Sequence, residues 1–284
     1  GMLALYLTAR INYKVWRRYA FFFLLAALGL SLLVFVPSLG LEHGGATRWV
    51  SLGFISFQPA EFLKIAFIIY FASWLSAVRE KADSFKYGLL PFFVLLGIIA
   101  AILLKQPDTK SLILMFVTGC AMYFMTGVSI KKIMIIGGIS IAGCALLAFT
   151  TPYLRDRVKT FMNPDHDPRG SSYQLKQALI AVGSGGVTGK GIGLSVQKFS
   201  YLPEPQGDSI FAVISEETGF IGSLVVIILY AAFAMRGLRI ASRAPDAFGR
   251  LLAVGLVIIL TAQSFLNIAS ILGLFPLTGV PLVF

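Results

Sequence analysis

The chain has 284 residues, of which 57% are hydrophobic and only 13% are charged, and its mean hydropathy is +0.83. Soluble globular domains carry about 25% charged residues, so this composition excludes that class and indicates a polytopic membrane protein. The net charge of +11 comes from basic residues scattered over short loops, which argues against a nucleic-acid partner. The two cysteines and two histidines have no metal-ligand spacing, so they predict no metal site.

A membrane-spanning helix needs about 20 predominantly apolar residues. Seven stretches of the sequence meet this requirement: 20–37, 60–78, 87–104, 111–128, 133–151, 209–235 and 251–275. The sequence therefore predicts an all-α helical bundle, with residues 1–284 forming a single transmembrane domain. Residues 2–9 are apolar but too few to span, and the loop-like stretch LFPLTGVP comes close to the end. We therefore expect the sequence to be truncated at both ends.

The predicted loops fall into two groups by their content of Lys and Arg. The basic group carries 13 such residues and consists of loops 10–18, 79–86, 128–132 and 236–250. The two short loops that alternate with them, 38–58 and 105–110, carry three. Because short cytoplasmic loops are enriched in Lys and Arg, the basic group is predicted to be cytoplasmic. Segment 152–208 then becomes a long extracytoplasmic loop.

The long loop 152–208 is expected to carry short helices. Residues 172–182 predict an amphipathic helix on the membrane surface, because apolar side chains recur with helical spacing at Leu175, Ala178, Leu179 and Val182. The glycine-rich string GSGGVTGKGIG follows this helix. It lacks the GK[ST] ending and the preceding strand of a phosphate-binding loop, so ATP binding is excluded there.

Acidic residues near the start of the apolar run 209–235 are the first candidates for chemistry. Asp208 lies where the polar loop meets this run, and Glu216 and Glu217 follow inside the predicted helix. A carboxylate at the end of a membrane helix is costly unless it has a partner or a function. Asp208 therefore either caps the following helix or takes part in a reaction, and the residues alone leave both alternatives open.

Charged residues earlier in the chain form two further candidate groups. In loop 38–58, Gly44–Gly45 predicts a turn. Arg48–Trp49 after it is either a membrane-surface anchor or a clamp for a lipid phosphate. Glu61 and Lys64 are three residues apart on a predicted helix, so they can pair. That pair is either structural or part of a polar cavity inside the bundle.

Two more polar positions carry structural expectations. Asp108 is predicted to cap the helix that starts near Ser111. Gln263 and Asn267 are four residues apart in the last predicted helix, so they share one face. Polar residues in membrane helices usually form hydrogen bonds with a neighbouring helix, and we expect the same of these two.

Five stretches taken together carry a family resemblance: GGATRWVSLGFISFQPAEFLK, KQPD, NPDHDPRGSSYQLKQALIAVGSGG, GIGLSVQKFSYLPEPQGDSIFAVISEETGFIG and NIASILGLFPLTGVPLVF. They resemble, in order and over nearly the whole chain, the SEDS family (shape, elongation, division and sporulation), which includes FtsW, RodA and SpoVE. The sequence around YLPEP and QALIAVGSGG is more similar to the FtsW members of the family than to RodA. The resemblance implies a fold of ten spans, of which about seven are complete here.

The resemblance also implies an activity and its essential acid. The family polymerises lipid II into glycan strands, and its acid falls on a pattern similar to LPEAHTDF. The matching stretch here is LPEPQGDSIF, which places Asp208 on that acid as the general base of an inverting displacement. Gln206–Gly207 replaces the family's His-Thr and Ser209 replaces its Phe, so a role for that His is not carried over. The implied enzyme is a peptidoglycan glycosyltransferase that acts in cell division or growth.

The same resemblance supplies candidate substrate-binding residues. QPAEFLK is similar to QPSELAK of the family, and Arg48–Trp49 matches its Arg-Trp pair. The candidates are Arg48, Trp49, Glu61, Lys64, Lys198 and Glu204. A pyrophosphate leaving group needs cations, for which Arg48, Lys64 and Lys198 are the candidates, with a divalent cation as the alternative. No other cofactor is expected.

The implied location is the bacterial cytoplasmic membrane, with the active site on the extracytoplasmic face. The implied partners are lipid II, the nascent glycan strand, a class B penicillin-binding protein transpeptidase, and other membrane proteins of division or elongation. Two alternatives stay open. A lipid II flippase would use the charged pair Glu61–Lys64 inside the bundle, and a scaffold of the division machinery would need none of these charges.

Overall fold

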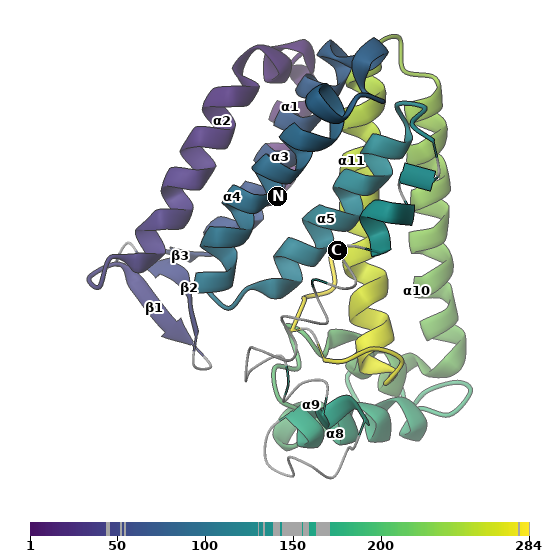
Figure 1. Ribbon diagram of the computed structural model, residues 1–284. Helices are drawn as coiled ribbons and strands as arrows, with labels where there is room; N and C mark the ends of the chain where they lie inside the picture. The colour runs from purple at the N-terminus through teal and green to yellow at the C-terminus, as the bar shows by residue number, and fades with distance from the viewer. Residues whose placement is uncertain are drawn as a thin grey trace. The chain divides into compact units, whose positions relative to one another are not determined.

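The computed structural model describes residues 1–43, 46–51, 53, 55–129, 131–132, 134–138, 143, 155, 159–162, 171–277 and 279–283. Helices dominate this part of the chain (Figure 1). The longer ones are α2 (Lys14–Leu32), α3 (Pro59–Ala77), α4 (Leu90–Lys105), α5 (Thr109–Phe124), α10 (Ile210–Ser242) and α11 (Ala247–Ile271). The shorter ones are α1 (Met2–Arg10), α8 (Ser171–Ser184) and α9 (Gln197–Ser200).

Five helical segments of the described chain are long and apolar enough to cross a membrane. They are Lys14–Phe35, Pro59–Ala77, Phe85–Lys105, Ile210–Ser242 and Ala247–Ile271. Short turns extend two of them: a 3-10 turn (Leu33–Phe35) follows α2, and a π turn (Phe85–Leu89) precedes α4. These five correspond to five of the seven predicted spans. The predicted span 111–128 is the shorter apolar helix α5, and 133–151 lies mostly outside the described residues.

The chain packs into two compact units. The first consists of Gly1–Ile133 and Arg236–Ile259, and the second of Met134–Met235 and Leu260–Phe284. Helix α11 therefore contributes about half of its length to each unit, whereas α10 belongs mainly to the second unit and contributes only Arg236–Ser242 to the first. The single transmembrane domain expected from the sequence stays a prediction.

Helix α3 forms the centre of the first unit. Its Phe67 and Phe71 are fully buried and stack with ring centroids 5.5 Å apart. The row of rings continues into Phe92 of α4, 5.1 Å from Phe71, and from there to Tyr123 of α5 at 6.2 Å. Gly119 of α5 permits this contact, because an added Cβ would lie only 2.5 Å from the Phe92 ring.

A small antiparallel sheet lies between α2 and α3 in the chain and was not predicted. The strand order is β1-β2-β3, with β1 (Gly40–His43), β2 (Ala46–Ser51) and β3 (Ser56–Phe57). Helix α3 comes after the sheet in the chain and is itself followed by a short 3-10 turn (Arg79–Lys81). Val50 of the central strand β2 pairs with both Gly40 of β1 and Phe57 of β3, and it is fully buried. The all-α prediction holds for the spans and omits this sheet. The predicted turn at Gly44–Gly45 lies outside the described residues.

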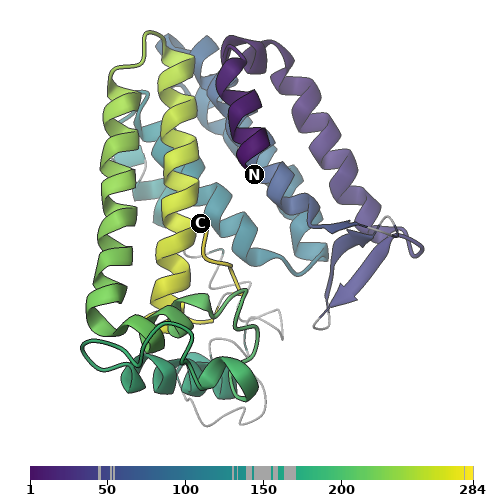
Figure 2. The same ribbon diagram turned by 180° about the vertical axis from the view of Figure 1, so that it is seen from behind.

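The second unit has its core where α8 meets the start of α10 and the end of α11. Both ribbon views show α8 and α9 next to the start of α10 and the end of α11 (Figures 1 and 2). The buried members of this core are Ala178, Ala181, Leu202, Phe211, Ala212, Val213, Ile268, Ile271 and Leu282. Helix α8 confirms the predicted helix 172–182. Its buried face differs by one position, because Ala181 is buried whereas Leu179 is 42% exposed.

The basic segment 236–250 was predicted to be a loop, and most of it is helical. Helix α10 continues to Ser242 and α11 begins at Ala247, which leaves a connection of four residues. The segment is rich in Arg and Ala, which favour helix. Asp246 then starts α11 as an N-cap, because its Oδ1 accepts a hydrogen bond from the Gly249 N–H at 2.6 Å.

Candidate active site

Asp208 lies in a tight loop two residues before α10 and is half-buried. The loop is closed by its own hydrogen bonds. The backbone N–H groups of Gly207 and Ser209 both donate to the Glu204 carbonyl at 3.2 Å, and the Ser209 hydroxyl donates to the Pro203 carbonyl at 3.0 Å. Glu204 takes a left-handed conformation with φ 48°, which lets the chain reverse within so few residues.

Two helices hold this loop from outside. From α8, the Gln174 side-chain amide donates to the buried Ser209 hydroxyl at 3.1 Å. From α11, the Asn267 side-chain amide donates to the Asp208 carbonyl at 2.7 Å. The backbone of Asp208 is therefore fixed between α8, α10 and α11. Exposed Glu204 and half-buried Lys198 lie on the same stretch of chain.

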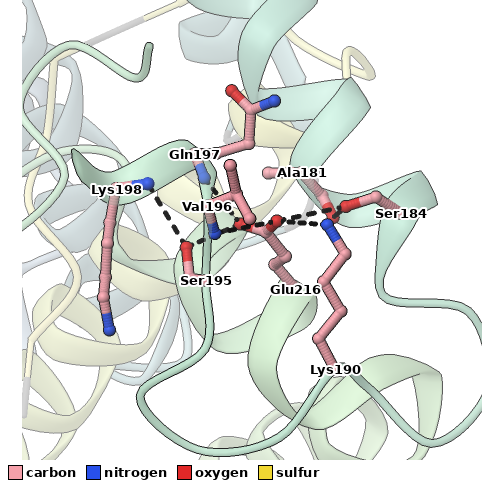
Figure 3. A network of polar contacts seen from close by, with 8 residues as sticks. All are labelled: Ala181, Ser184, Lys190, Ser195, Val196, Gln197, Lys198 and Glu216. Atoms are coloured by element: carbon pink, nitrogen blue, oxygen red, sulfur yellow. Dashed lines mark hydrogen bonds and ion pairs between the residues drawn. The ribbon is translucent and has the colours of Figure 1, made fainter. Parts of the chain in front are cut away.

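Glu216 is the best-connected carboxylate of the described chain, and its side chain is fully buried (Figure 3). Its Oε1 forms an ion pair with Lys190 at 2.6 Å, and its Oε2 accepts the Ser195 hydroxyl at 2.6 Å. The backbone N–H groups of Val196 and Gln197 also donate to it, at 3.3 and 3.2 Å. Glu216 thus supplies the acceptors that the first N–H groups of α9 need.

Glu217, the next residue, binds the same segment at a second point. Its Oε1 forms an ion pair with Lys198 at 2.6 Å, and it accepts backbone hydrogen bonds from Gly193 and Ser195. Lys198, predicted as a pyrophosphate-binding cation, is therefore already matched by a carboxylate. The two adjacent glutamates together fix the chain that leads into the Asp208 loop.

The glycine-rich segment 183–193 packs against an interruption in α10. Gly219 leaves the helical conformation, with φ 68° and ψ −163°, and the backbone groups released there are satisfied by the segment. The carbonyls of Glu216 and Glu217 in α10 accept hydrogen bonds from the N–H groups of Lys190 and Gly191, both at 3.0 Å. In the other direction, the N–H groups of Phe220 and Ile221 donate to the carbonyls of Gly186 and Val187, at 2.9 and 3.2 Å. The glycine-rich segment therefore pairs its backbone with that of α10.

Arg48 lies in the first unit and binds backbone. From β2, its guanidinium donates to the carbonyls of Gln106 and Pro107, at 3.2 and 2.8 Å, and so ties the sheet to the turn between α4 and α5. Trp49 next to it is 38% exposed. Asp108 of the same turn is fully buried and accepts the Ser111 N–H at 3.4 Å and the Ser111 hydroxyl at 2.8 Å, so its predicted capping role is confirmed.

Glu61 and Lys64 pair as predicted, at 2.8 Å, near the start of α3. The two partners differ in environment, because the Lys64 side chain is only 6% exposed and the Glu61 side chain is 47% exposed. Lys64 thus lies inside the first unit, whereas Glu61 reaches its edge.

The predicted site residues are divided between the two units. Arg48, Trp49, Glu61 and Lys64 belong to the first, and Lys198, Glu204 and Asp208 to the second. No role was predicted for Lys190 or Ser195, although a carboxylate inside an apolar run was a signal that Glu216 needed such partners. Among the described residues, no group of three His, Cys, Asp or Glu side chains is placed to hold a metal ion.

Gln263 and Asn267 share a face as predicted, and the hydrogen bonds that their side-chain amides donate go to irregular segments and not to a neighbouring helix. Gln263 donates to the Pro281 carbonyl at 3.3 Å, and Asn267 donates to Asp208 and to Val280. Backbone carbonyls in irregular segments take part in no helical hydrogen bonds, so they can accept hydrogen bonds from these two side-chain amides.

Comparison with known proteins places the whole chain in one family. The model of the cell cycle protein family FtsW/RodA/SpoVE matches residues 1–284. The chain belongs to this family. Stage V sporulation protein E of Bacillus subtilis (strain 168) is 37% identical over 284 residues, which cover all of this chain and 78% of that protein. The probable peptidoglycan glycosyltransferase FtsW of Geobacter sulfurreducens (strain DL-1 / KN400) is 39% identical over 275 residues, covering 97% and 74% of the two chains.

Solved structures agree with this FtsW/RodA/SpoVE membership. A chain from a peptidoglycan synthase complex that coordinates polymerization and crosslinking matches with a TM-score of 0.81 and 25% identity, over 99% of this chain and 79% of that one. The rod shape determining protein RodA of Thermus thermophilus has the same fold, with a TM-score of 0.69 and 24% identity over 99% and 75% of the chains. Together with the five membrane-length apolar segments among the described residues, this membership makes the chain a multi-pass membrane protein.

Proposed function

We propose that this protein is a peptidoglycan glycosyltransferase that polymerises lipid II into glycan strands, with Asp208 as the general base. The observation that carries the proposal is the placement of Asp208, on a loop closed on itself at the start of α10 and tied to α8 and α11. A carboxylate whose backbone is fixed in this way is held in one position relative to a bound substrate, as a catalytic group must be. Family membership supplies the reaction, since matching relatives bear that enzyme name.

The chemistry needs one base. The Asp208 carboxylate removes the proton from the 4-hydroxyl of the acceptor GlcNAc, and the resulting oxygen attacks C1 of the donor MurNAc. The C1–oxygen bond to undecaprenyl pyrophosphate breaks, and the leaving group departs as an anion without needing a proton. A single displacement inverts the configuration at C1, and it requires no second carboxylate as a nucleophile.

The leaving pyrophosphate requires positive charge. Lys198 is the cation on the same stretch of chain as Asp208, and its ion pair with Glu217 at 2.6 Å competes with any phosphate. Arg48, Lys64 or a divalent cation are the other sources of charge. Lys198 therefore serves the leaving group only when the ion pair with Glu217 opens.

We place the reaction at the extracytoplasmic face of the bacterial cytoplasmic membrane, because the basic loops assign segment 152–208 to that side. A synthase that only polymerises leaves the strands uncrosslinked. The solved complex that this chain resembles coordinates polymerization with crosslinking, so we assign a class B penicillin-binding protein transpeptidase as the partner here.

Lipid II transport is the second candidate function, and one observation favours it. Lys64 places a charge inside the first unit, paired with Glu61 at the edge of that unit, and charges inside a bundle often mark a transport path. A flippase uses this pair, whereas a polymerase depends on Asp208. The two functions therefore predict different effects of the same substitutions.

Substitution of Asp208 by Asn tests the polymerase directly. Asn has the same size and caps a helix about as well as Asp, but it cannot accept the proton. We expect Asp208→Asn to fold, to bind lipid II and to lose about 10²–10⁴ in polymerisation rate. The measurement is glycan formation from lipid II by purified protein with its transpeptidase partner, together with lipid II binding and thermal stability in detergent.

Asp83→Asn is the matched control, because it makes the same chemical change on an exposed carboxylate that pairs with Lys132 at 2.7 Å. It should leave polymerisation unchanged. Near-normal glycan from well-folded Asp208→Asn would exclude Asp208 as the base. If Glu61→Gln instead stopped transport of lipid II across vesicles, the flippase would become the better assignment.

A further inference from the structure

Asn267 of α11 connects two segments that are far apart in the chain. Its Nδ2 lies 2.7 Å from the carbonyl oxygen of Asp208 and 2.6 Å from that of Val280. A side-chain amide carries two N–H groups, so each hydrogen serves one of these carbonyls. The side chain is buried, with 1% of the residue exposed, and it holds the Asp208 loop against the chain after α11.

The orientation of this amide follows from its partners. Both are carbonyl oxygens, which only accept hydrogen bonds, so the opposite orientation would set the Asn267 oxygen against two acceptors. In the orientation observed, Oδ1 is buried and has no hydrogen-bond partner in the described chain. A buried acceptor without a partner is unfavourable. The side chain of Asn267 therefore stabilises the structure through its two N–H donors, one of which binds the Asp208 carbonyl and the other the Val280 carbonyl.

We propose that Asn267 is a positioning residue for the base, and this inference rests on the proposed role of Asp208. The hydrogen bond fixes the peptide group between Asp208 and Ser209, and through it the direction in which the Asp208 side chain leaves the backbone. The loop's internal bonds and Gln174 hold the neighbouring residue Ser209. Asn267 adds a bond to residue 208 itself, from a long buried helix.

Gln263 provides a matched control on the same helix. It lies one turn before Asn267, is also buried, and donates through its side-chain amide to the Pro281 carbonyl at 3.3 Å. Gln263 and Asn267 therefore both hold the chain after α11, and Asn267 also holds Asp208. Gln263→Leu removes the bond to Pro281 and leaves the bond to Asp208 in place, whereas Asn267→Leu removes the bonds to Val280 and to Asp208 together.

The experiment compares Asn267→Leu, Gln263→Leu and Asp208→Asn in the full protein with lipid II as substrate. For Asn267→Leu we expect kcat per folded molecule to fall by about 10²-fold, the size of effect that a misplaced catalytic group produces, while lipid II binding stays unchanged. The acidic limb of the kcat–pH profile should shift, because the base has left its environment. Gln263→Leu should keep both kcat and the pH profile of the wild-type protein.

Hydrogen exchange gives a readout that does not depend on turnover. Asn267→Leu should speed exchange in residues 201–209 and in 279–283, whereas Gln263→Leu should speed it in 279–283 alone. Asn267→Ser keeps one donor and removes bulk, so it carries the test if the Leu variant does not fold. Its kcat should fall between those of the wild type and Asn267→Leu.

The outcomes separate this inference from the function on which it rests. If Asp208→Asn polymerises lipid II normally, the proposed base is wrong, whatever the Asn267 variants do. If Asp208→Asn is inactive while both Asn267 variants match Gln263→Leu in kcat, pH profile and exchange of 201–209, Asp208 remains the base and the positioning role of Asn267 is overturned.

Discussion

Asp246 caps α11 and also binds the start of α2 through its side chain. The hydrogen bond from the Gly249 N–H holds the pKa of the Asp246 carboxyl below its usual range. Partial burial acts to raise this pKa, but the Tyr13 hydroxyl and the charges of Lys14 and Arg17 also lower it. The Tyr13 hydroxyl donates to Asp246 at 2.8 Å, and this bond is the main reason that the pKa of Tyr13 is raised. The start of α2 is thereby joined to the start of α11.

These shifts predict how stability depends on pH. A carboxyl whose pKa is lower in the folded state binds fewer protons there, so its contribution is complete above the unfolded pKa of about 3.9. That contribution is lost as the pH falls through the folded pKa. Asp246→Asn keeps the cap without a titrating group, so its melting temperature should fall less than that of the wild type between pH 5 and pH 3. Thermal unfolding in detergent across this range measures the difference, and equal slopes for the two proteins would contradict the assignment.

At the scale of elements, α10 is shaped by the interruption at Gly219. The positive φ of 68° there is one that glycine adopts at little cost. An added Cβ would also lie 2.4 Å from the Gly189 nitrogen and 2.6 Å from the Val187 carbonyl. Backbone from the glycine-rich segment occupies the space that a side chain would need. The break in α10 and this segment therefore require each other.

Gly219→Ala should consequently destabilise the protein, by about 1–3 kcal/mol for the strained backbone alone and by more for the contact with Gly189. Gly97→Ala is the control, because Gly97 lies within α4 with open space around its Cα. There Ala should be neutral or stabilising by up to about 1 kcal/mol. Melting temperatures of the two variants test this contrast, and a Gly219→Ala protein as stable as the wild type would refute the packing argument.

The sequence predicted the long helices well because their signal is local and repeated. Asp108 as a cap and Glu61–Lys64 as a pair also depend on residues within one turn of each other. The sheet at residues 40–57 was missed because strand pairing joins residues that are not neighbours in the chain. The partners of Glu216 lie 19 to 32 residues away, and the link from Asn267 to Asp208 crosses 59, so no local pattern could reveal them.

At the scale of the whole molecule, contacts between loops agree with the grouping of the loops by charge. Within the predicted cytoplasmic group, Tyr13 bonds to Asp246 at 2.8 Å, and Lys132 pairs with Asp83 at 2.7 Å. Within the other group, Arg48 of loop 38–58 binds Pro107 of loop 105–110 at 2.8 Å. Each contact joins loops of one group. The side of the membrane on which each group lies stays a prediction from the positive-inside rule.

The orientation of α10 provides the test of that prediction. The part of α10 after the break runs from Phe220 to Ser242, and its 23 residues make about 35 Å at 1.5 Å per residue. This exceeds the hydrocarbon thickness of about 30 Å, so its two ends reach opposite faces. Gln206 lies in the loop before α10, and Ala244 lies in the connection after it. The two positions should therefore differ in accessibility from outside the cell.

Single cysteines at these positions make the orientation measurable. In a protein with Cys120 and Cys144 replaced by Ala, an impermeant maleimide should label Gln206→Cys in intact cells. The same reagent should label Ala244→Cys only after the membrane is permeabilised, because four Arg residues in segment 236–250 favour the cytoplasm. Labelling of both variants in permeabilised cells is the control for reactivity. Labelling of Ala244→Cys in intact cells would show that the orientation is the opposite of the predicted one. Asp208 would then lie on the cytoplasmic face and could not serve glycan polymerisation outside the cell.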